Sequence, residues 1–247
     1  MKYVYIGNQM KLSVIIPVFN EKDTIREVLE KVKRSPVKKE IIIIDDGSND
    51  GTKELLQDAQ RKLTYNHDIK ILYLDKNLGK GQAIKKGLSL AKGDYIIIQD
   101  ADLEYDPNEY PKLLKPVLNK EADVVFGSRL LERNKNSRRD HFLYMGRTSI
   151  SWATNILFGS HLTDVYTCFK LIPNDLVQNF DITANGFELE AELTAKILLS
   201  GKKIKEVPID YNPRSKKAGK KITWIDWFIG VRMLLMLRFK KITRTSQ

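Results

Sequence analysis

Short apolar stretches rich in Val and Ile alternate, over the first part of the chain, with segments in which apolar residues recur every three or four positions. The apolar stretches predict buried β-strands at residues 12–19, 41–44, 69–74 and 95–99. The segments of helical periodicity predict helices at residues 25–32, 52–63 and 83–88. Regular alternation with short connections predicts βαβ units, right-handed crossovers and a parallel sheet.

The second part of the chain continues this pattern less regularly. It predicts helices at 113–118, 146–158 and 186–199 and strands at 123–126, 169–172 and 204–211. Residues 130–140 are rich in Lys, Arg and Asn and predict a surface loop. At 247 residues the chain can form one large domain or a domain with an appendage, and we find no internal repeat.

Polar loops follow the predicted strands of the first part, at residues 20–21, 45–46, 77–81 and 100–102. In an open parallel sheet, ligands bind outside the carboxyl ends of the strands. We therefore expect these four loops to converge on one crevice.

The loop after residues 95–99 carries two carboxylates, Asp100 and Asp102, one residue apart. On an extended backbone such positions point the same way. Oxygen ligands from a rigid strand end suit Mg²⁺ or Mn²⁺, which leave further positions to water and substrate phosphates. The alternative is an acidic turn that caps the next helix.

The C-terminal segment differs in character. Thr223 to Asp226 fits a capping box, and from there to Phe239 the chain is almost entirely apolar apart from Asp226, Arg232 and Arg238. Further basic residues follow at Lys240, Lys241 and Arg244. The segment is too short to span a bilayer, so we expect it in the plane of an anionic lipid interface. The alternative is packing on the domain or in a homo-oligomer interface.

Net charge is +11 and the sequence pI is about 9.5, which indicates polyanionic partners: nucleic acid, nucleotide phosphates or an anionic bilayer. Residues 1–11 lack the apolar core of a signal peptide, and no apolar run reaches the ~18–20 residues of a spanning helix. We expect a protein that is cytoplasmic and peripheral at the cytoplasmic face of a membrane. Cys168 is the only cysteine, so we expect no disulfide and a buried thiol.

Five motifs mark the loops: Ser13-Val-Ile-Ile-Pro-Val-Phe-Asn-Glu21, Ile44-Asp-Asp-Gly-Ser-Asn-Asp-Gly-Thr52, Asn77-Leu-Gly-Lys-Gly81, Asp100-Ala-Asp-Leu-Glu104 and Gly127-Ser-Arg129. Together and in this order they resemble family 2 glycosyltransferases of the GT-A fold, and within them the polyprenyl-phosphate glycosyltransferases of the dolichol-phosphate mannose synthase type. The resemblance implies an α/β fold with a mostly parallel central sheet flanked by helices. It covers residues 12–221, so we expect a GT-A domain at 1–221 and a basic amphipathic helix and tail at 222–247.

The resemblance also implies which residues bind the nucleotide sugar: Pro17, Phe19, Glu21, Ile44, Asp46, Asp100, Ala101, Asp102, Arg129, Val207, Arg214 and Lys220. Asp46 would lie beside the base, where a carboxylate can accept from a base N–H or a ribose hydroxyl. An Asx turn is the alternative for Asp45 and Asp46. Arg129 would meet a phosphate of the donor or the acceptor.

Two positions depart from the family pattern. The mannose synthases commonly have a glutamine two residues after the second aspartate, where this chain has Glu104. We expect Glu104 either to join Asp100 and Asp102 as a metal ligand or to face solvent. The family's Gly-x-Ser-Lys is here Ala218-Gly-Lys-Lys221, so another lysine of residues 216–221 could substitute for Lys220, or the run could be merely solvated.

The acceptor decides whether a general base is needed. A hydroxyl acceptor must lose a proton as it attacks, whereas a phosphate acceptor is already an anion. The candidates for a base or pocket-shaping carboxylate are Asp164, Glu188 and Glu190, the last two on a predicted helix and unable to share a face. The residues expected to act in catalysis are Asp102, Arg129, Asp164 and Glu190.

The resemblance therefore implies a metal-dependent inverting enzyme that moves one sugar from a GDP-mannose or UDP-hexose type donor to a polyprenyl phosphate. An enzyme acting on a hydroxyl of a saccharide, lipid or small molecule is the alternative. A sugar nucleotidyltransferase should have a glycine-rich basic loop where this chain has residues 17–21. A nucleic-acid-binding protein would not need Asp100 or Asp102, so we expect no nucleic-acid partner.

Overall fold

The computed structural model describes residues 10–62, 68–131, 141–213 and 224–244. Seven strands form one sheet in the order β3-β2-β1-β4-β6-β5-β7. Their bounds are β1 Leu12–Val18, β2 Lys39–Asp45, β3 Ile69–Tyr73, β4 Tyr95–Ile98, β5 Val124–Ser128, β6 Lys170–Pro173 and β7 Ile204–Pro208. All neighbours pair in parallel except β6, which is antiparallel to both β4 and β5. The sheet is mostly parallel, as predicted.

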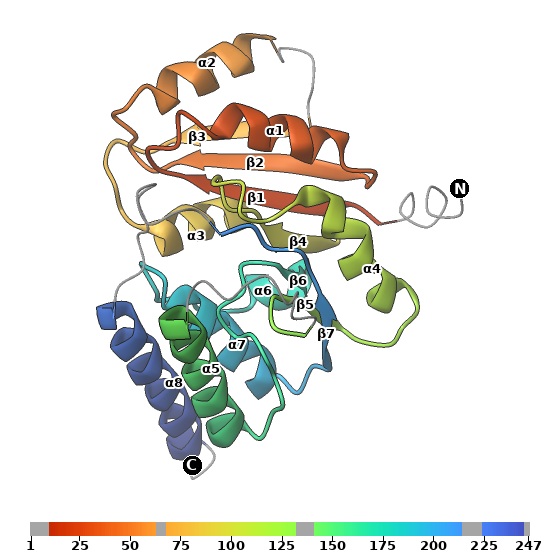
Figure 1. The fold of residues 1–247 in the computed structure, drawn as a ribbon, viewed down its shortest axis with the longest axis vertical. Helices are drawn as coiled ribbons and strands as arrows, with labels where there is room; N and C mark the ends of the chain where they lie inside the picture. Colours follow the sequence, from red (N-terminus) through yellow and green to blue (C-terminus); the bar gives the residue numbers. More distant parts are fainter. Residues whose placement is uncertain (1–9, 63–67, 132–140, 214–223, 245–247) are drawn as a thin grey trace.

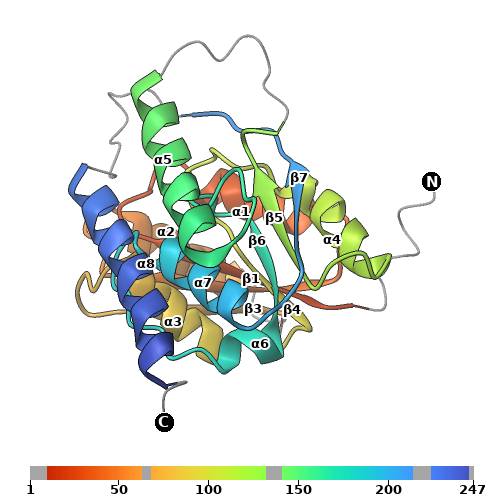
Figure 2. The same cartoon turned by 90° about the horizontal axis from the view of Figure 1, so that it is seen from below.

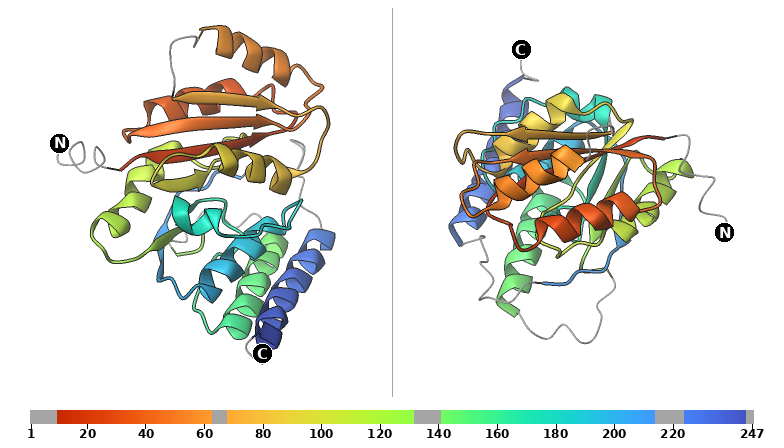
Figure 3. Two further views of the ribbon diagram at one scale, coloured as in Figure 1. Left: turned by 180° about the vertical axis from the view of Figure 1, so that it is seen from behind. Right: turned by 90° about the horizontal axis from the view of Figure 1, so that it is seen from above.

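Helices cover both faces of the sheet (Figures 1 and 3). The helices α1 (Ile25–Arg34), α2 (Thr52–Lys62) and α4 (Tyr110–Leu118) lie on one face, with the short 3₁₀ helix η1 (Pro107–Glu109) before α4. The helices α3 (Lys80–Leu90) and α6 (Asn174–Gln178) lie on the other. The central strands β1, β2 and β4 each contain a continuous apolar run because both faces of a parallel sheet are covered.

Three helices pack on one another and form a helix group: α5 (His141–Phe158), α7 (Leu189–Leu199) and α8 (Trp224–Arg244). They lie together at the lower end of Figure 1, and Figure 2 shows them from below in front of the sheet. Ile150, Ala191, Ala195 and Leu234 form a small buried core between them. No helix in the described part of the chain is both long and apolar enough to cross a bilayer.

Several element bounds differ from the predicted ones for local reasons. Helix α7 begins at Leu189, because the Glu188 carboxylate accepts from the backbone N–H groups of Asn185 (2.9 Å) and Gly186 (3.0 Å) and holds that turn. Strand β7 ends at Pro208, although Tyr211 still forms an isolated bridge with Tyr105. The direction of β6 could not be read from periodicity, since parallel and antiparallel strands alternate side chains alike.

Candidate active site

A cavity of about 390 Å³ opens at the carboxyl ends of β1, β2 and β4. The predicted site residues that line it are Pro17, Phe19, Glu21, Asp46, Asp100, Ala101, Asp102, Glu104, Arg129 and Glu190. The four polar loops therefore converge on one crevice, as predicted. The hydroxyl of Thr24 joins two of them, because it donates to the Ala101 carbonyl (2.6 Å) and to the Glu21 carboxylate (3.0 Å).

Asp46 holds the 77–81 loop to the end of β2. Its Oδ1 accepts from the backbone N–H of Leu78 (2.8 Å) and its Oδ2 from that of Gly79 (2.9 Å). Each carboxylate oxygen has a second lone pair, so these bonds leave room for the predicted contact with a nucleoside. That contact stays a prediction.

Glycines allow the start of α3 to approach the segment before α7. Gly79 has φ 95°, and a Cβ there would lie 2.3 Å from the Asn185 carbonyl oxygen. A Cβ on Gly81 would lie 2.3 Å from the Ala184 carbonyl oxygen, and the Gly81 N–H donates to Asn185 (2.8 Å). This close approach places Lys80, between the two glycines, against α7.

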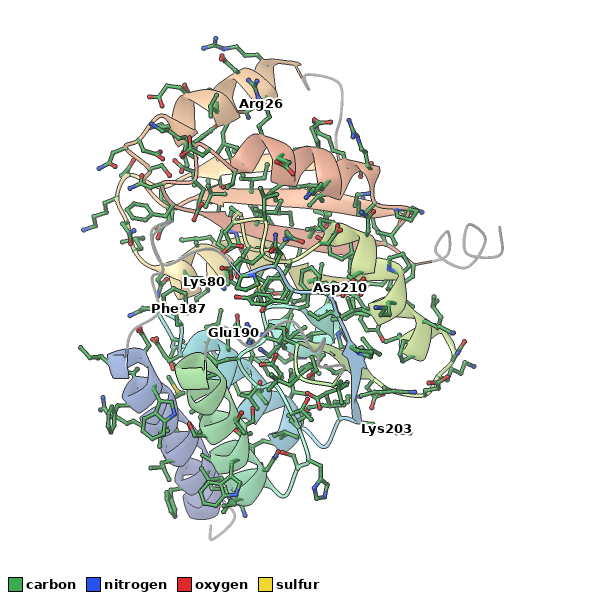
Figure 4. All side chains as sticks on the ribbon, viewed as in Figure 1. Arg26, Lys80, Phe187, Glu190, Lys203 and Asp210 are labelled. Carbon is green, nitrogen blue, oxygen red and sulfur yellow. The ribbon has the colours of Figure 1, made fainter. Side chains whose placement is uncertain are left out.

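Four charges of alternating sign run from the core into the cavity: Lys170, Glu190, Lys80 and Asp100. Lys170 is fully buried and donates to one oxygen of Glu190. The other Glu190 oxygen lies 3.6 Å from Lys80 Nζ, which lies 2.7 Å from Asp100 Oδ1. Figure 4 shows Lys80, Phe187 and Glu190 close together between the sheet and the helix group.

Lys80 remains a cation in this setting. Burial alone lowers the pKa of its ammonium group, but Asp100 and Glu190 outweigh burial and raise that pKa well above its usual value. The Phe187 ring adds a cation–π contact, with Nζ 5.8 Å from the ring centroid. The site thus contains a built-in positive charge directly on one of the two predicted metal ligands.

Cys168 lies on the cavity wall with its Sγ 3.9 Å from Lys80 Nζ and is buried, as predicted. Burial raises the pKa of its thiol, and the neighbouring Asp100 raises it further. The thiol therefore stays protonated, so a nucleophilic or redox role has no support here.

Arg129 and Asp164 form a bidentate ion pair. The Nε and Nη2 groups of Arg129 donate to the two Asp164 oxygens at 2.7 Å and 2.8 Å. The Asp164 side chain has no exposed surface and does not line the cavity. Asp164 is thus the counter-ion that holds the Arg129 side chain, whereas its role as a base stays a prediction.

Two tyrosines complete the surroundings of Arg129. Its guanidinium carbon lies 5.8 Å from the centroid of the Tyr105 ring and 5.1 Å from that of Tyr211. The Tyr211 hydroxyl donates to Glu104 Oε2 at 2.6 Å. Glu104 is therefore engaged by the strand segment after β7, and its role as a metal ligand stays a prediction.

The donor set of the predicted metal site suits a hard divalent cation. Asp100 and Asp102 both face the cavity, and carboxylate oxygens are what Mg²⁺ and Mn²⁺ prefer. No three His, Cys, Asp or Glu side chains within the described ranges are grouped closely enough to hold a metal by themselves. The residues present therefore fit a cation that takes its remaining ligands from water and donor phosphates.

The loop that presents Asp102 has an unusual backbone. Leu103 has φ 65°, in the left-handed region that β-carbons disfavour. The Asp102 Oδ1 accepts from the Glu104 N–H at 3.1 Å, so an Asx turn and a possible metal ligand are the same residue. Both interpretations of this acidic turn are compatible in one geometry.

Some of the predicted site residues are not among those that line the cavity. Ile44 and Val207 are buried in the main core and do not line the cavity. Arg214 and Lys220 lie outside the described residues. Conversely, the cavity contains Lys80, Tyr105, Tyr166, Phe187 and Tyr211, to which we had assigned no role. Lys80 could have been found, since it stands inside a recognised glycine-rich motif.

Comparison with known proteins gives the family. Residues 13–175 match the sequence profile of Glycosyl transferase family 2. The chain belongs to glycosyl transferase family 2. In this family 2 chain the matched region ends on β6 and α6. It therefore includes the carboxyl ends of β1, β2 and β4.

Two relatives with functional names are similar over most of the chain. The dolichol-phosphate mannosyltransferase of Pyrococcus furiosus is 27% identical over 223 residues, which are 85% of this chain and 59% of that protein. The low-salt glycan biosynthesis hexosyltransferase Agl6 of Haloferax volcanii is 28% identical over 229 residues, which are 91% of this chain and 53% of that protein. This family 2 chain therefore spans between about half and three-fifths of those relatives.

Solved structures of the GT-A fold match the whole architecture. A glucosyl-3-phosphoglycerate synthase from Mycobacterium tuberculosis, crystallised with Mn²⁺, UDP-glucose and phosphoglyceric acid, superimposes with a TM-score of 0.70 and 19% identity. The match covers 96% of this chain and 82% of that one. At this identity the likeness shows that the chain has the GT-A fold.

Proposed function

We propose that this family 2 protein is an inverting glycosyltransferase that moves one sugar from a nucleotide sugar to a polyprenyl phosphate at the cytoplasmic face of a membrane. The observation that carries the proposal is the cavity in which Asp100 and Asp102 face Lys80 and Arg129. Such a mixture of carboxylates and cations suits a diphosphate that binds through a divalent metal. A donor of the GDP-mannose or UDP-hexose type meets this requirement.

Different residues of the cavity would bind different parts of the donor. Asp100 and Asp102 would hold Mg²⁺ or Mn²⁺, which when bound stabilises the negative charge of the departing nucleoside diphosphate. Lys80 and Arg129 line the same cavity and would add positive groups beside the diphosphate. Glu21 and Asp46, near the ends of β1 and β2, line the cavity and would accept hydrogen bonds from the nucleoside.

The state of the candidate bases supports a phosphate acceptor. Asp164 is fully buried on Arg129, and Glu190 is held by the fully buried Lys170. A phosphate oxygen attacks without giving up a proton, so a site whose carboxylates already serve as counter-ions suits it. The Pyrococcus relative, named for transfer to dolichol phosphate, points in the same direction.

The outer face of α8 supports a lipid surface as the place of action. Its exposed apolar residues are Ile225, Phe228, Ile229, Leu235, Met236 and Phe239. Arg232, Arg238 and Lys240 are exposed on the same helix, and the neighbouring α5 adds exposed Trp152 and Ile156. Apolar residues mixed with basic ones, on a chain of net charge +11, fit an anionic bilayer surface.

A donor and acceptor panel tests the proposal. The protein is incubated with Mn²⁺, a short polyprenyl phosphate and, in turn, GDP-mannose, UDP-glucose and UDP-N-acetylglucosamine, and nucleoside diphosphate release is measured. We expect release with one donor, and none when the polyprenyl phosphate is replaced by the dephosphorylated alcohol. Equal release with the alcohol would refute the phosphate acceptor.

A hydroxyl acceptor is the second candidate. Glu190 lines the cavity, and its Oε1 makes no hydrogen bond within the described structure but lies 3.6 Å from Lys80 Nζ, so it would accept a proton or a sugar hydroxyl only beside this ion pair. The structural neighbours are named for synthesis of glucosyl- and mannosyl-3-phosphoglycerate. Release that depends on 3-phosphoglycerate, with none on polyprenyl phosphate, would favour this function.

A further inference from the structure

The inner face of the C-terminal helix α8 contacts a residue of another segment that also lines the cavity. Gly230 and Leu234 are buried on this inner face, whereas Leu235 and Met236 are exposed on the outer one. Helix α8 packs on both α5 and α7. Figure 1 shows the three helices side by side.

Tyr166 is the residue that connects the cavity with the helix group. It lines the cavity near Glu190, and it also packs against the small core of the helix group. Its hydroxyl donates to the backbone carbonyl of Asp226 on α8 at 3.4 Å. Burial raises the pKa of the Tyr166 hydroxyl, so it stays protonated and able to donate.

Gly230 makes this contact possible. A Cβ at position 230 would lie 2.1 Å from the Tyr166 hydroxyl oxygen and 3.2 Å from its ring carbon Cζ. A glycine inside a helix is intrinsically less favourable than an alanine. The close approach to Tyr166 is thus the reason that the structure gives for a glycine at this turn of α8.

We infer that Gly230 is a positioning residue for glycosyl transfer: by seating α8 directly on Tyr166, it sets where the Tyr166 ring stands in the wall of the cavity. In this arrangement α8 packs behind the cavity wall as well as presenting an exposed face at the surface. The choice of acceptor in the activity test rests on the proposed function, whereas the position of Tyr166 does not.

A double-mutant cycle tests the contact through activity. Gly230→Ala is expected to slow nucleoside diphosphate release with Mn²⁺ and farnesyl phosphate on the order of 10²-fold, because small displacements in a site have effects of that size. In a Tyr166→Phe background, which lacks the clashing oxygen, Gly230→Ala should cause little further loss. Equal losses in the two backgrounds would overturn the inference.

A spectroscopic test needs no acceptor. The chain has 10 tyrosines, which can be labelled as 3-fluorotyrosine, and the Tyr166 signal is the one missing from Tyr166→Phe. Leu234→Ala, on the buried face of α8, should shift this ¹⁹F signal, whereas its exposed neighbour Leu235→Ala should leave it in place. An unmoved signal in Leu234→Ala would overturn the inference.

The two tests also separate this inference from the proposed function. If the wild-type protein releases no nucleoside diphosphate with any polyprenyl phosphate, the proposed function fails, and the ¹⁹F comparison still decides the role of α8. If Gly230→Ala fails to fold, the Leu234 and Leu235 pair still gives an answer.

Discussion

Lys80 Nζ lies 2.7 Å from Asp100 Oδ1, on the wall of a cavity in which Asp100 is also a predicted metal ligand. Lys80 is the first residue of α3 and Asp100 follows β4, and Gly79 and Gly81 on either side of Lys80 let this start of α3 approach Ala184 and Asn185. A lysine in this place neutralises the acidic site before any metal binds. If Asp100 binds the predicted metal, Lys80 and the divalent cation would compete for the same carboxylate.

Removal of the Lys80 charge should change the affinity for the metal and the rate of transfer in opposite directions. In Lys80→Met, Asp100 loses its internal counter-ion, so we expect Mn²⁺ to bind the donor-free protein more tightly in calorimetry. Transfer should fall by about 10²–10³-fold, because a fixed positive group at the diphosphate is lost. Lys86→Met, on the exposed face of the same helix, is the control for charge. Unchanged Mn²⁺ affinity in Lys80→Met would argue against competition.

Asp102→Ala should lower transfer by at least about 10²-fold while the circular dichroism spectrum stays that of the wild type. The physical reason is that this carboxylate faces the cavity at the end of β4 and contributes to no core packing. Asp175→Asn, an exposed carboxylate on α6, should retain activity. Wild-type turnover in Asp102→Ala would refute the metal assignment.

Asp164→Asn should destabilise the protein by about 3–5 kcal/mol, because it leaves the buried Arg129 guanidinium without its charged partner. The free energy of unfolding in urea measures this. Glu27→Gln, in an exposed pair with Lys31, should have little effect. If Asp164 were instead a general base, the variant would lose activity with stability unchanged.

Asp45 should make stability fall as the pH rises. It is fully buried, neither carboxylate oxygen has a well-formed hydrogen bond, and burial raises the Asp45 pKa, which the nearby Ser48 offsets only in part. The folded protein therefore holds this proton to higher pH than the unfolded chain, so stability decreases between the unfolded and folded pKa values. Asp45→Asn should be more stable than the wild type at pH 7, with a smaller difference near pH 4. A larger advantage at pH 4 would contradict this.

The outer face of α8 should control lipid binding. Replacing Phe228 and Phe239, each more than half exposed, with serine should weaken sedimentation with anionic vesicles and leave the melting temperature near that of the wild type. Neutral vesicles serve as the control for charge. Unchanged sedimentation would assign the face to a protein partner or to a second copy of the chain.

The alternation of apolar and helical segments determined the α/β class, the parallel central strands and the crevice at their carboxyl ends. Those features depend on local periodicity and on the general geometry of βαβ units, so the sequence contains them. Motif order likewise predicted donor-side residues from Pro17 to Arg129, and most of these line the cavity.

The tertiary structure alone decided which charges pair. Asp164 and Arg129, 35 positions apart, meet because β5 and the segment after α5 are neighbours, and that pairing makes the candidate base a counter-ion. Glu190 meets Lys170 and Lys80 from two other elements. Whether a carboxylate is a base, a metal ligand or a counter-ion depends on the charged groups that distant segments bring close to it. No local sequence pattern encodes which of these groups meet.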